Sequence, residues 1–237
     1  MIKRFAYSIF TLFVIITITF FLMHAIPGNV YNSEKNLPPA IVDNIKAKYG
    51  LDKPLSEQYL TMLENTVKLD FGISMKNRGR PVNDIITEHF PHSARLGIFS
   101  IALCLFVGIP LGVLSALKKD RWQDRVAMII ATLGVSVPGF VVAVLTQYLL
   151  GVKLGWFPVI GDKSIHHLVL PAIALSFLPI SFIARLVRSS MVEVLEQDYI
   201  RTARAKGLSE RVVIYKHALK NSIMPVMTYL GPLVAGV

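Results

Sequence analysis

The sequence is short of cysteine and of charge. Cys104 is the only cysteine in 237 residues, which excludes a disulfide within the chain and a cysteine-based zinc site. Charged residues make up 17% of the chain, against about 25% in a typical soluble domain. The nucleotide-binding pattern Gly-x-x-x-x-Gly-Lys-[Ser/Thr] is absent, as are Gly-x-Ser-x-Gly and His-Glu-x-x-His. The chain therefore carries no motif for hydrolysing ATP itself.

Charge is missing above all from a few long hydrophobic stretches. A helix needs about 20 residues to cross about 30 Å of hydrocarbon. Stretches of this kind predict an all-α, polytopic transmembrane bundle of five spans, rather than buried helices of a soluble protein. The first one is too long for a signal-peptide core and lacks a small-x-small cleavage site, so we expect an uncleaved span. The uncharged stretches are 5–33, 96–117, 126–152, 164–184 and 221–237.

The net charge of +10 is concentrated in some of the connecting segments. Residues 118–125 hold four basic and two acidic residues, and residues 185–220 hold eight and four. Residues 27–92 are balanced, with eight of each sign, and residues 153–163 are short. Because short basic loops stay in the cytoplasm, we expect the N-terminus, 118–125 and 185–220 inside and the other two segments outside.

The long outer segment predicts short helices joined by turns. Residues 37–49 and 54–68 read as helices, the second amphipathic, and residues 82–90 as a short helix leading into the second span. Asp70-Phe71-Gly72 and Gly79-Arg80-Pro81 are turn signals. The segment is too small for a stable separate domain, so we expect it to pack on the outer face of the spans.

The inner segment predicts two short helices joined by a glycine turn. Gly207 is well placed to end the first helix with a positive φ. Ser209 is placed to cap the second helix, over about 210–220, by accepting a backbone N–H. Such a rigid knob could bind in a groove on a soluble partner, or its basic face could lie on anionic lipid. Chemistry alone favours the lipid.

The stretch from Asp198 to Ser209, Asp-Tyr-Ile-Arg-Thr-Ala-Arg-Ala-Lys-Gly-Leu-Ser, resembles a known motif. It is similar to the coupling loop of binding-protein-dependent ABC transporter permeases of the dipeptide/oligopeptide/nickel branch. Ala203 and Gly207 match the second Ala and the Gly of the pattern Glu-Ala-Ala, three residues, Gly, nine residues, Ile-x-Leu-Pro. Arg201 stands at the Glu and Thr202 at the first Ala, so an ion pair of that Glu with the ATPase is not carried over. Only Leu219 remains of the Ile-x-Leu-Pro end.

Further short matches cover most of the chain. They include Tyr49-Gly50-Leu51-Asp52-Lys53-Pro54-Leu55 in the outer segment and Gly134-Val135-Ser136-Val137-Pro138-Gly139-Phe140 in the third span. The resemblance implies a type I ABC importer permease of the peptide B type with six spans. This chain would then lack the end of the fifth span and all of the sixth.

The resemblance also implies an organisation and partners. Residues 1–26 would be the first transmembrane helix, 27–92 an extracytoplasmic insertion and 93–237 the permease core, with the coupling loop at 188–220. We expect a bacterial or archaeal cell-membrane protein that works with a sister permease, two ABC ATPase subunits, an extracytoplasmic substrate-binding protein and membrane lipid. No cofactor, metal or nucleic acid is implied. The implied ATPase-coupling residues are Asp198, Thr202, Ala203, Ala205, Lys206, Gly207, Leu208 and Ser209.

Other functions remain as alternatives. A nickel or other small-solute permease shares the same motifs. An ion-coupled carrier usually keeps acidic residues within its spans, but the uncharged stretches offer only His24, His166 and His167, near their ends. An intramembrane hydrolase would rest on Ser136, Ser176 or Ser181, which are residue types that usually pack or bond backbone in spans. DNA binding by 198–220 conflicts with its tether between two spans.

Overall fold

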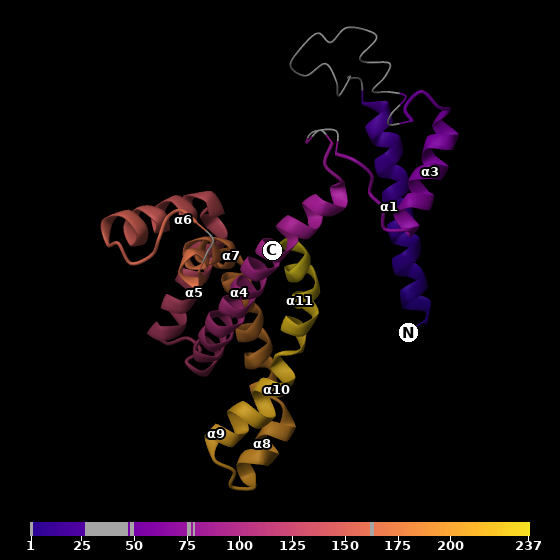
Figure 1. Ribbon diagram of the computed structural model, residues 1–237. Helices are drawn as coiled ribbons and strands as arrows, with labels where there is room; N and C mark the ends of the chain where they lie inside the picture. Colours follow the sequence, from indigo (N-terminus) through magenta and orange to yellow (C-terminus); the bar gives the residue numbers. More distant parts are fainter. Residues whose placement is uncertain (1, 27–46, 48–49, 75–76, 78, 162–163) are drawn as a thin grey trace. The chain divides into compact units, whose positions relative to one another are not determined.

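The computed structural model describes residues 2–26, 47, 50–74, 77, 79–161 and 164–237, and most of them are helical (Figure 1). Within these ranges the β-type pairing consists of one antiparallel bridge, between Ile73 and Pro81. The predicted all-α class is confirmed. The chain divides into two compact units, Met1–Glu88 and His89–Val237. The three-part division expected from the sequence stays a prediction.

Among the described residues, three helices are long and apolar enough to cross a membrane: α1 (Ile2–Ala25), α4 (Val82–Leu117) and α7 (Ile165–Leu195). Each contains one of the predicted uncharged stretches or the greater part of it. Helix α4 begins at Val82, so the short helix expected over 82–90 is the first part of the same continuous helix. Pro91 lies inside α4 without ending it, as happens in membrane helices where other groups satisfy the freed carbonyl.

The third predicted span is broken near its middle. Helix α5 (Trp122–Ser136) and the helical segment Gly139–Lys153 meet at 105°. Pro138 stands at the break and precedes α6 (Gly139–Thr146). Because proline lacks an N–H and disfavours helical geometry in the residue before it, α5 ends there. Helix α6 then continues as a π-helix, η1 (Gln147–Lys153).

In the first unit, α3 (Leu55–Val67) confirms the amphipathic helix expected over 54–68. Its Tyr59 contacts α1: the ring lies 5.3 Å from that of Phe20 and 5.6 Å from that of Phe21, and its hydroxyl is 2.7 Å from the Thr17 hydroxyl. No residue of α3 is buried. The helix is thus attached through one aromatic side chain and a few polar contacts.

The turn signals of the outer segment are confirmed. Gly72 and Gly79 both adopt positive φ, +71° and +82°. Asn83 fastens the segment to α4, since its amide oxygen accepts from Phe71 N at 2.9 Å and its amide nitrogen donates to the Leu69 carbonyl at 2.6 Å. The helix expected over residues 37–49 lies almost entirely outside the described residues.

In the second unit, α7 packs closely against α4 and α5. A Cβ added to Gly112 of α4 would lie 2.6 Å from the Ala184 carbonyl oxygen of α7. A Cβ on Gly134 of α5 would collide with the Ser181 hydroxyl. Glycine therefore permits the backbones of these helices to approach, as in other membrane helix pairs. Cys104 is buried in the same core, where its thiol lies 3.7 Å from the Ser176 carbonyl.

The last hydrophobic stretch forms two helices, α10 (Leu219–Ser222) and α11 (Met224–Gly236). Helix α11 has 13 residues, fewer than the roughly 20 that a straight span requires. Its Val226 and Leu233 are buried in the core cluster of the second unit. The predicted fifth span is thus present as an apolar helix packed on that unit.

Candidate functional site

Between α7 and α11 the chain forms a helical knob, residues 198–222. It consists of α8 (Asp198–Ala205), α9 (Glu210–Val212), the π-helix η2 (Val213–Ala218) and α10. In Figure 1, α8 and α9 lie side by side at the lower end of the second unit, beyond α10. The predicted helix, glycine turn and second helix are all present. The second helix runs through a π-helical segment, a feature often found at functional sites.

Gly207 makes the turn between the two helices. Its φ is +75°, as predicted for a helix C-terminal stop. The Gly207 N–H donates to the Arg204 carbonyl at 2.9 Å, and the Leu208 N–H donates to the Ala203 carbonyl at 3.4 Å. These two bonds form a Schellman motif, which satisfies the last carbonyls of α8. A Cβ at Gly207 would meet no atom within 4 Å, so it is the backbone conformation, and not lack of space, that favours glycine here.

The prediction for Ser209 is right in position and wrong in detail. Ser209 is the N-cap residue of α9, but its side chain makes no capping hydrogen bond. The turn is instead closed by an ion pair, with Arg204 Nε 2.8 Å from Glu210 Oε1. Because this pair already links the end of α8 to the start of α9, the hydroxyl of Ser209 is not required to hold the turn.

The inner face of the knob belongs to the core of the second unit. Ile200 of α8 and Val213 of η2 are fully buried. They share one apolar cluster with Val187 and Met191 of α7. The Asn221 amide also donates to the Tyr199 hydroxyl at 2.8 Å and so joins α10 to α8. The knob is therefore packed into the same core as the apolar helices of its unit.

The outer face of the knob carries most of the predicted coupling residues. Ala203 is the exception: it is buried in the core cluster, so its small size serves packing within the chain rather than contact with a partner. Thr202 donates its hydroxyl to the Asp198 carbonyl within α8, and Leu208 is a 40% exposed leucine at the tip. The exposed members of the predicted set are Asp198, Thr202, Ala205, Lys206, Gly207, Leu208 and Ser209.

Beside the tip, the exposed side of α9 and η2 is hollowed. Arg211, Val212, Tyr215 and Lys216 line an open depression of about 360 Å³. It combines cationic ends with an exposed tyrosine that is 59% accessible. Such a surface suits noncovalent contact with a macromolecule; no group of three or more His, Cys, Asp or Glu side chains in the described residues is placed to hold a metal ion.

Comparison with known proteins decides the family. Residues 108–237, which include the knob, match the family described as "Binding-protein-dependent transport system inner membrane component". Residues 1–97 match the corresponding N-terminal family of membrane components. The chain belongs to the binding-protein-dependent transport permeases.

Relatives of this permease family resemble the chain along its whole length. The dipeptide transport system permease protein DppB of Bacillus subtilis is 47% identical over 237 residues, which is 100% of this chain and 77% of that protein. The oligopeptide transport system permease proteins OppB of Haemophilus influenzae and Salmonella typhimurium are each 42% identical, over 99% of this chain and 78% of their own length. The resemblance to the peptide branch inferred from the short motifs is confirmed.

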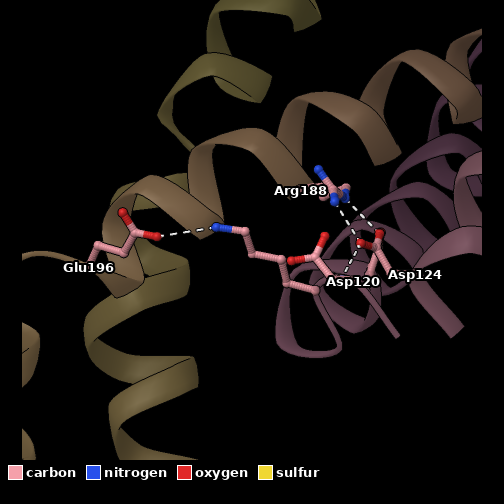
Figure 2. A network of polar contacts seen from close by, with 6 residues as sticks. Asp120, Asp124, Arg188 and Glu196 are labelled. Carbon is pink, nitrogen blue, oxygen red and sulfur yellow. Dashed lines mark hydrogen bonds and ion pairs between the residues drawn. The ribbon is translucent and has the colours of Figure 1, made fainter. Parts of the chain in front are cut away.

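A buried polar cluster that sequence analysis does not predict lies between α5 and α7. The carboxylate of Asp124, at the start of α5, receives two bonds from the guanidinium of Arg188 in α7, each of 2.6 Å. Figure 2 shows this pair, with Asp120 and Glu196 close by. Sixty-four residues separate the partners, and the sequence pattern does not pair them. Their positions beside apolar stretches are the one signal available.

The three serines and two of the histidines, His24 and His167, that the rival functions would use have structural partners. Ser136, Ser176 and Ser181 bond the carbonyls of Thr132, Ile173 and Phe177, at 3.0 to 3.2 Å, within their own helices. The His167 ring lies 2.9 Å from the Ser164 hydroxyl, and the His24 ring contacts Phe20 O and Gln58. Ser136, Ser176 and Ser181 bond backbone as expected for spans, so their hydroxyls are paired with carbonyls of their own helices and not with a base.

A second hollow lies where the start of α7 meets α4. Its volume is about 270 Å³, and its wall mixes cationic, imidazole and apolar groups. Gly161, with φ +120°, allows the His167 ring to lie against the backbone there. The lining residues are His92, Ser93, Arg95, Leu96, Gly161, His167, Leu168 and Pro171.

Proposed function

We propose that this chain is one of the two permease subunits of an ATP-driven importer for di- or oligopeptides. It forms half of the translocation pathway, a sister permease forms the other half, and an extracytoplasmic binding protein delivers the peptide. Two ATPase subunits bind the knob and supply the energy by hydrolysing ATP. The peptide as substrate is supported by the similarity to dipeptide and oligopeptide permeases over nearly the whole chain.

One structural observation carries the mechanism: the exposed tip of the knob and the buried interior of the spans are parts of one packed body. Ile200 and Ala203 lie one turn of helix from the exposed coupling residues, and both belong to the cluster that contains Val187 and Met191 of α7. A force applied at the tip therefore reaches α7 through close-packed side chains, which deform little.

The proposed orientation places the knob and the N-terminus in the cytoplasm, because the basic connecting segments are the ones retained inside. The ATPases would then contact the Schellman turn and the outer face of α8 through Asp198, Thr202, Ala205, Lys206, Gly207, Leu208 and Ser209. Their closure on ATP binding would displace the knob, and the spans would open the pathway alternately to each side.

Reconstitution tests this function directly. The full-length chain is placed in proteoliposomes with its sister permease, the two ATPases and the binding protein. We expect dipeptides or oligopeptides to stimulate both ATP hydrolysis and uptake of labelled peptide, whereas nickel complexes do neither. Stimulation by nickel alone would overturn the substrate class. Uptake that survives without ATP and disappears when the proton gradient collapses would indicate an ion-coupled carrier.

A further inference from the structure

Asp124 is the one charged residue that the described part of the chain buries, with 3% of its surface exposed. Its carboxylate is fully engaged. Arg188 Nε contacts Oδ1 and Arg188 Nη2 contacts Oδ2, each at 2.6 Å. The backbone N–H of Asp120 donates to Oδ2 at 3.0 Å, and the Ser115 hydroxyl donates to Oδ1.

These partners come from different structural segments. Ser115 belongs to α4, Asp120 to the turn between α4 and α5, and Arg188 to α7. One carboxylate therefore ties two helices and a turn to the helix that carries it. A second, exposed ion pair joins the same turn to the end of α7, with Lys119 Nζ 3.3 Å from Glu196 Oε1 (Figure 2).

The cluster stands close to the knob. Helix α7 ends at Leu195, and α8 begins at Asp198. Arg188 thus lies about two turns before the end of the helix that leads into the knob, at 3.6 residues a turn. Any displacement of the knob that moves the end of α7 must act on the Asp124–Arg188 pair.

The geometry of the pair is more specific than packing requires. Apolar side chains of the same volume often hold helices together as firmly as a buried ion pair does. A bidentate arginine–carboxylate pair additionally fixes the relative orientation of its two helices. Gly112 and Gly134 bring α4 and α5 into backbone contact with α7 nearby, so that orientation is transmitted along closely packed helices.

We propose that Asp124 is a positioning residue of the transport cycle: paired with Arg188, it locks the ends of α4 and α5 to α7, so that displacement of the knob moves all three helices together. This inference rests on the proposed function. Without the pair, the ATPases would still move the knob and α7, but α4 and α5 would follow incompletely and ATP would be hydrolysed without matching transport.

The test measures peptide taken up per ATP hydrolysed by the complete reconstituted importer. The variants are Asp124→Asn, Arg188→Lys and Ser115→Ala. Arg188→Lys keeps the positive charge but loses the guanidinium group that contacts both carboxylate oxygens. Ser115→Ala removes one hydrogen-bond donor to the carboxylate. We expect basal hydrolysis to stay within about twofold of the wild type, while uptake per ATP falls by between about twofold and thirtyfold, the range reported for residues that transmit coupling. The loss should be largest for Asp124→Asn and smallest for Ser115→Ala.

Asp120→Asn is the matched control. It removes the same charge four residues away, on an exposed residue with φ +64°, a conformation that asparagine tolerates. The backbone N–H that serves Asp124 remains, and the lost carboxylate supplies only the weakest of the charge interactions on Arg188, so uptake per ATP should stay close to that of the wild type. An equal loss in this control would overturn the proposal, because the effect would then follow charge in the turn rather than the pair.

A purely structural role predicts a different result. The variants would then yield less assembled complex, with uptake per ATP unchanged, and that outcome overturns the proposal. If the Asp124→Asn complex does not assemble, the proposal is tested on Arg188→Lys and Ser115→Ala alone. If none of the three complexes assembles, the proposal is also overturned, because the cluster would then serve folding. A wild-type complex that takes up no peptide contradicts the proposed function, whereas a coupled wild type with equally coupled variants contradicts only this inference.

Discussion

The knob and α3 are both amphipathic helical segments outside the apolar stretches, but they are attached to the rest of the chain in different ways. The knob buries Ile200 and Val213 completely and shares the core of its unit. Helix α3 buries no residue, and Val67 at its end is 84% exposed. Similar sequence patterns therefore lead to one segment built into a core and one laid on a surface.

The attachments of α3 are mainly those of a surface helix. Tyr59 supplies its ring contacts to α1, and the ion pairs Lys53–Glu57 and Lys68–Glu64 are exposed on both sides. Exposed pairs of this kind contribute little to stability. Segments with few buried apolar contacts open locally at low cost. The difference is consistent with the proposed transporter, in which the knob would transmit movement and α3 would only cover part of α1.

The largest expected effect comes from removing the side chain that anchors the knob. Ile200→Ala leaves a cavity in a fully buried site, and we expect it to lower the free energy of unfolding by about 2–5 kcal/mol. Val67→Ala, at the end of α3, should change it by no more than about 0.5 kcal/mol. Thermal unfolding of the purified full-length protein in detergent measures both. Equal losses in the two variants would show that the knob is no better anchored than α3.

The sequence was sufficient for features that depend on local chemistry. Charge-free length predicted the spans, and glycine at position 207 predicted the turn, because only glycine adopts positive φ without strain. These features require no knowledge of what packs against them.

Features that depend on packing were beyond the sequence. The presence of Pro138 does not predict the 105° angle at the break between α5 and α6. Ala203 was expected at a docking surface, but the packing of α8 against η2 and the core cluster buries it. The Asp124–Arg188 pair joins positions 64 residues apart, and no local pattern links such partners.

The next largest effect is on function and concerns the tip of the knob. Gly207→Val forces a β-branched residue into φ near +75°, which costs about 1–3 kcal/mol locally and should distort the coupling turn. We expect normal membrane insertion and a fall in peptide uptake of about tenfold, since about 1.4 kcal/mol corresponds to that factor. Uptake into proteoliposomes, normalised to inserted protein, is the measurement.

Gly207→Asn is the matched variant for this position. A Cβ there meets no atom within 4 Å, so both substitutions fit sterically and differ mainly in backbone preference. Asparagine tolerates the left-handed conformation and should retain most of the uptake. Wild-type uptake by an inserted Gly207→Val protein would contradict the role of the knob. Equal loss in both variants would indicate that a partner occupies the space where any side chain at position 207 would stand, and that backbone shape is not the cause.

The smallest expected effect concerns the surface attachment of α3. Tyr59→Phe removes the hydroxyl that lies 2.7 Å from the Thr17 hydroxyl and keeps the ring contacts with Phe20 and Phe21. We expect a loss of about 0.5–1.5 kcal/mol in unfolding free energy, the usual net value of one hydrogen bond, and unchanged peptide uptake. Lys68→Gln, in an exposed ion pair of the same helix, should change neither. A drop in peptide uptake for Tyr59→Phe comparable to that for Gly207→Val would mean that α3 also transmits movement, and the contrast between the knob and α3 would then fail.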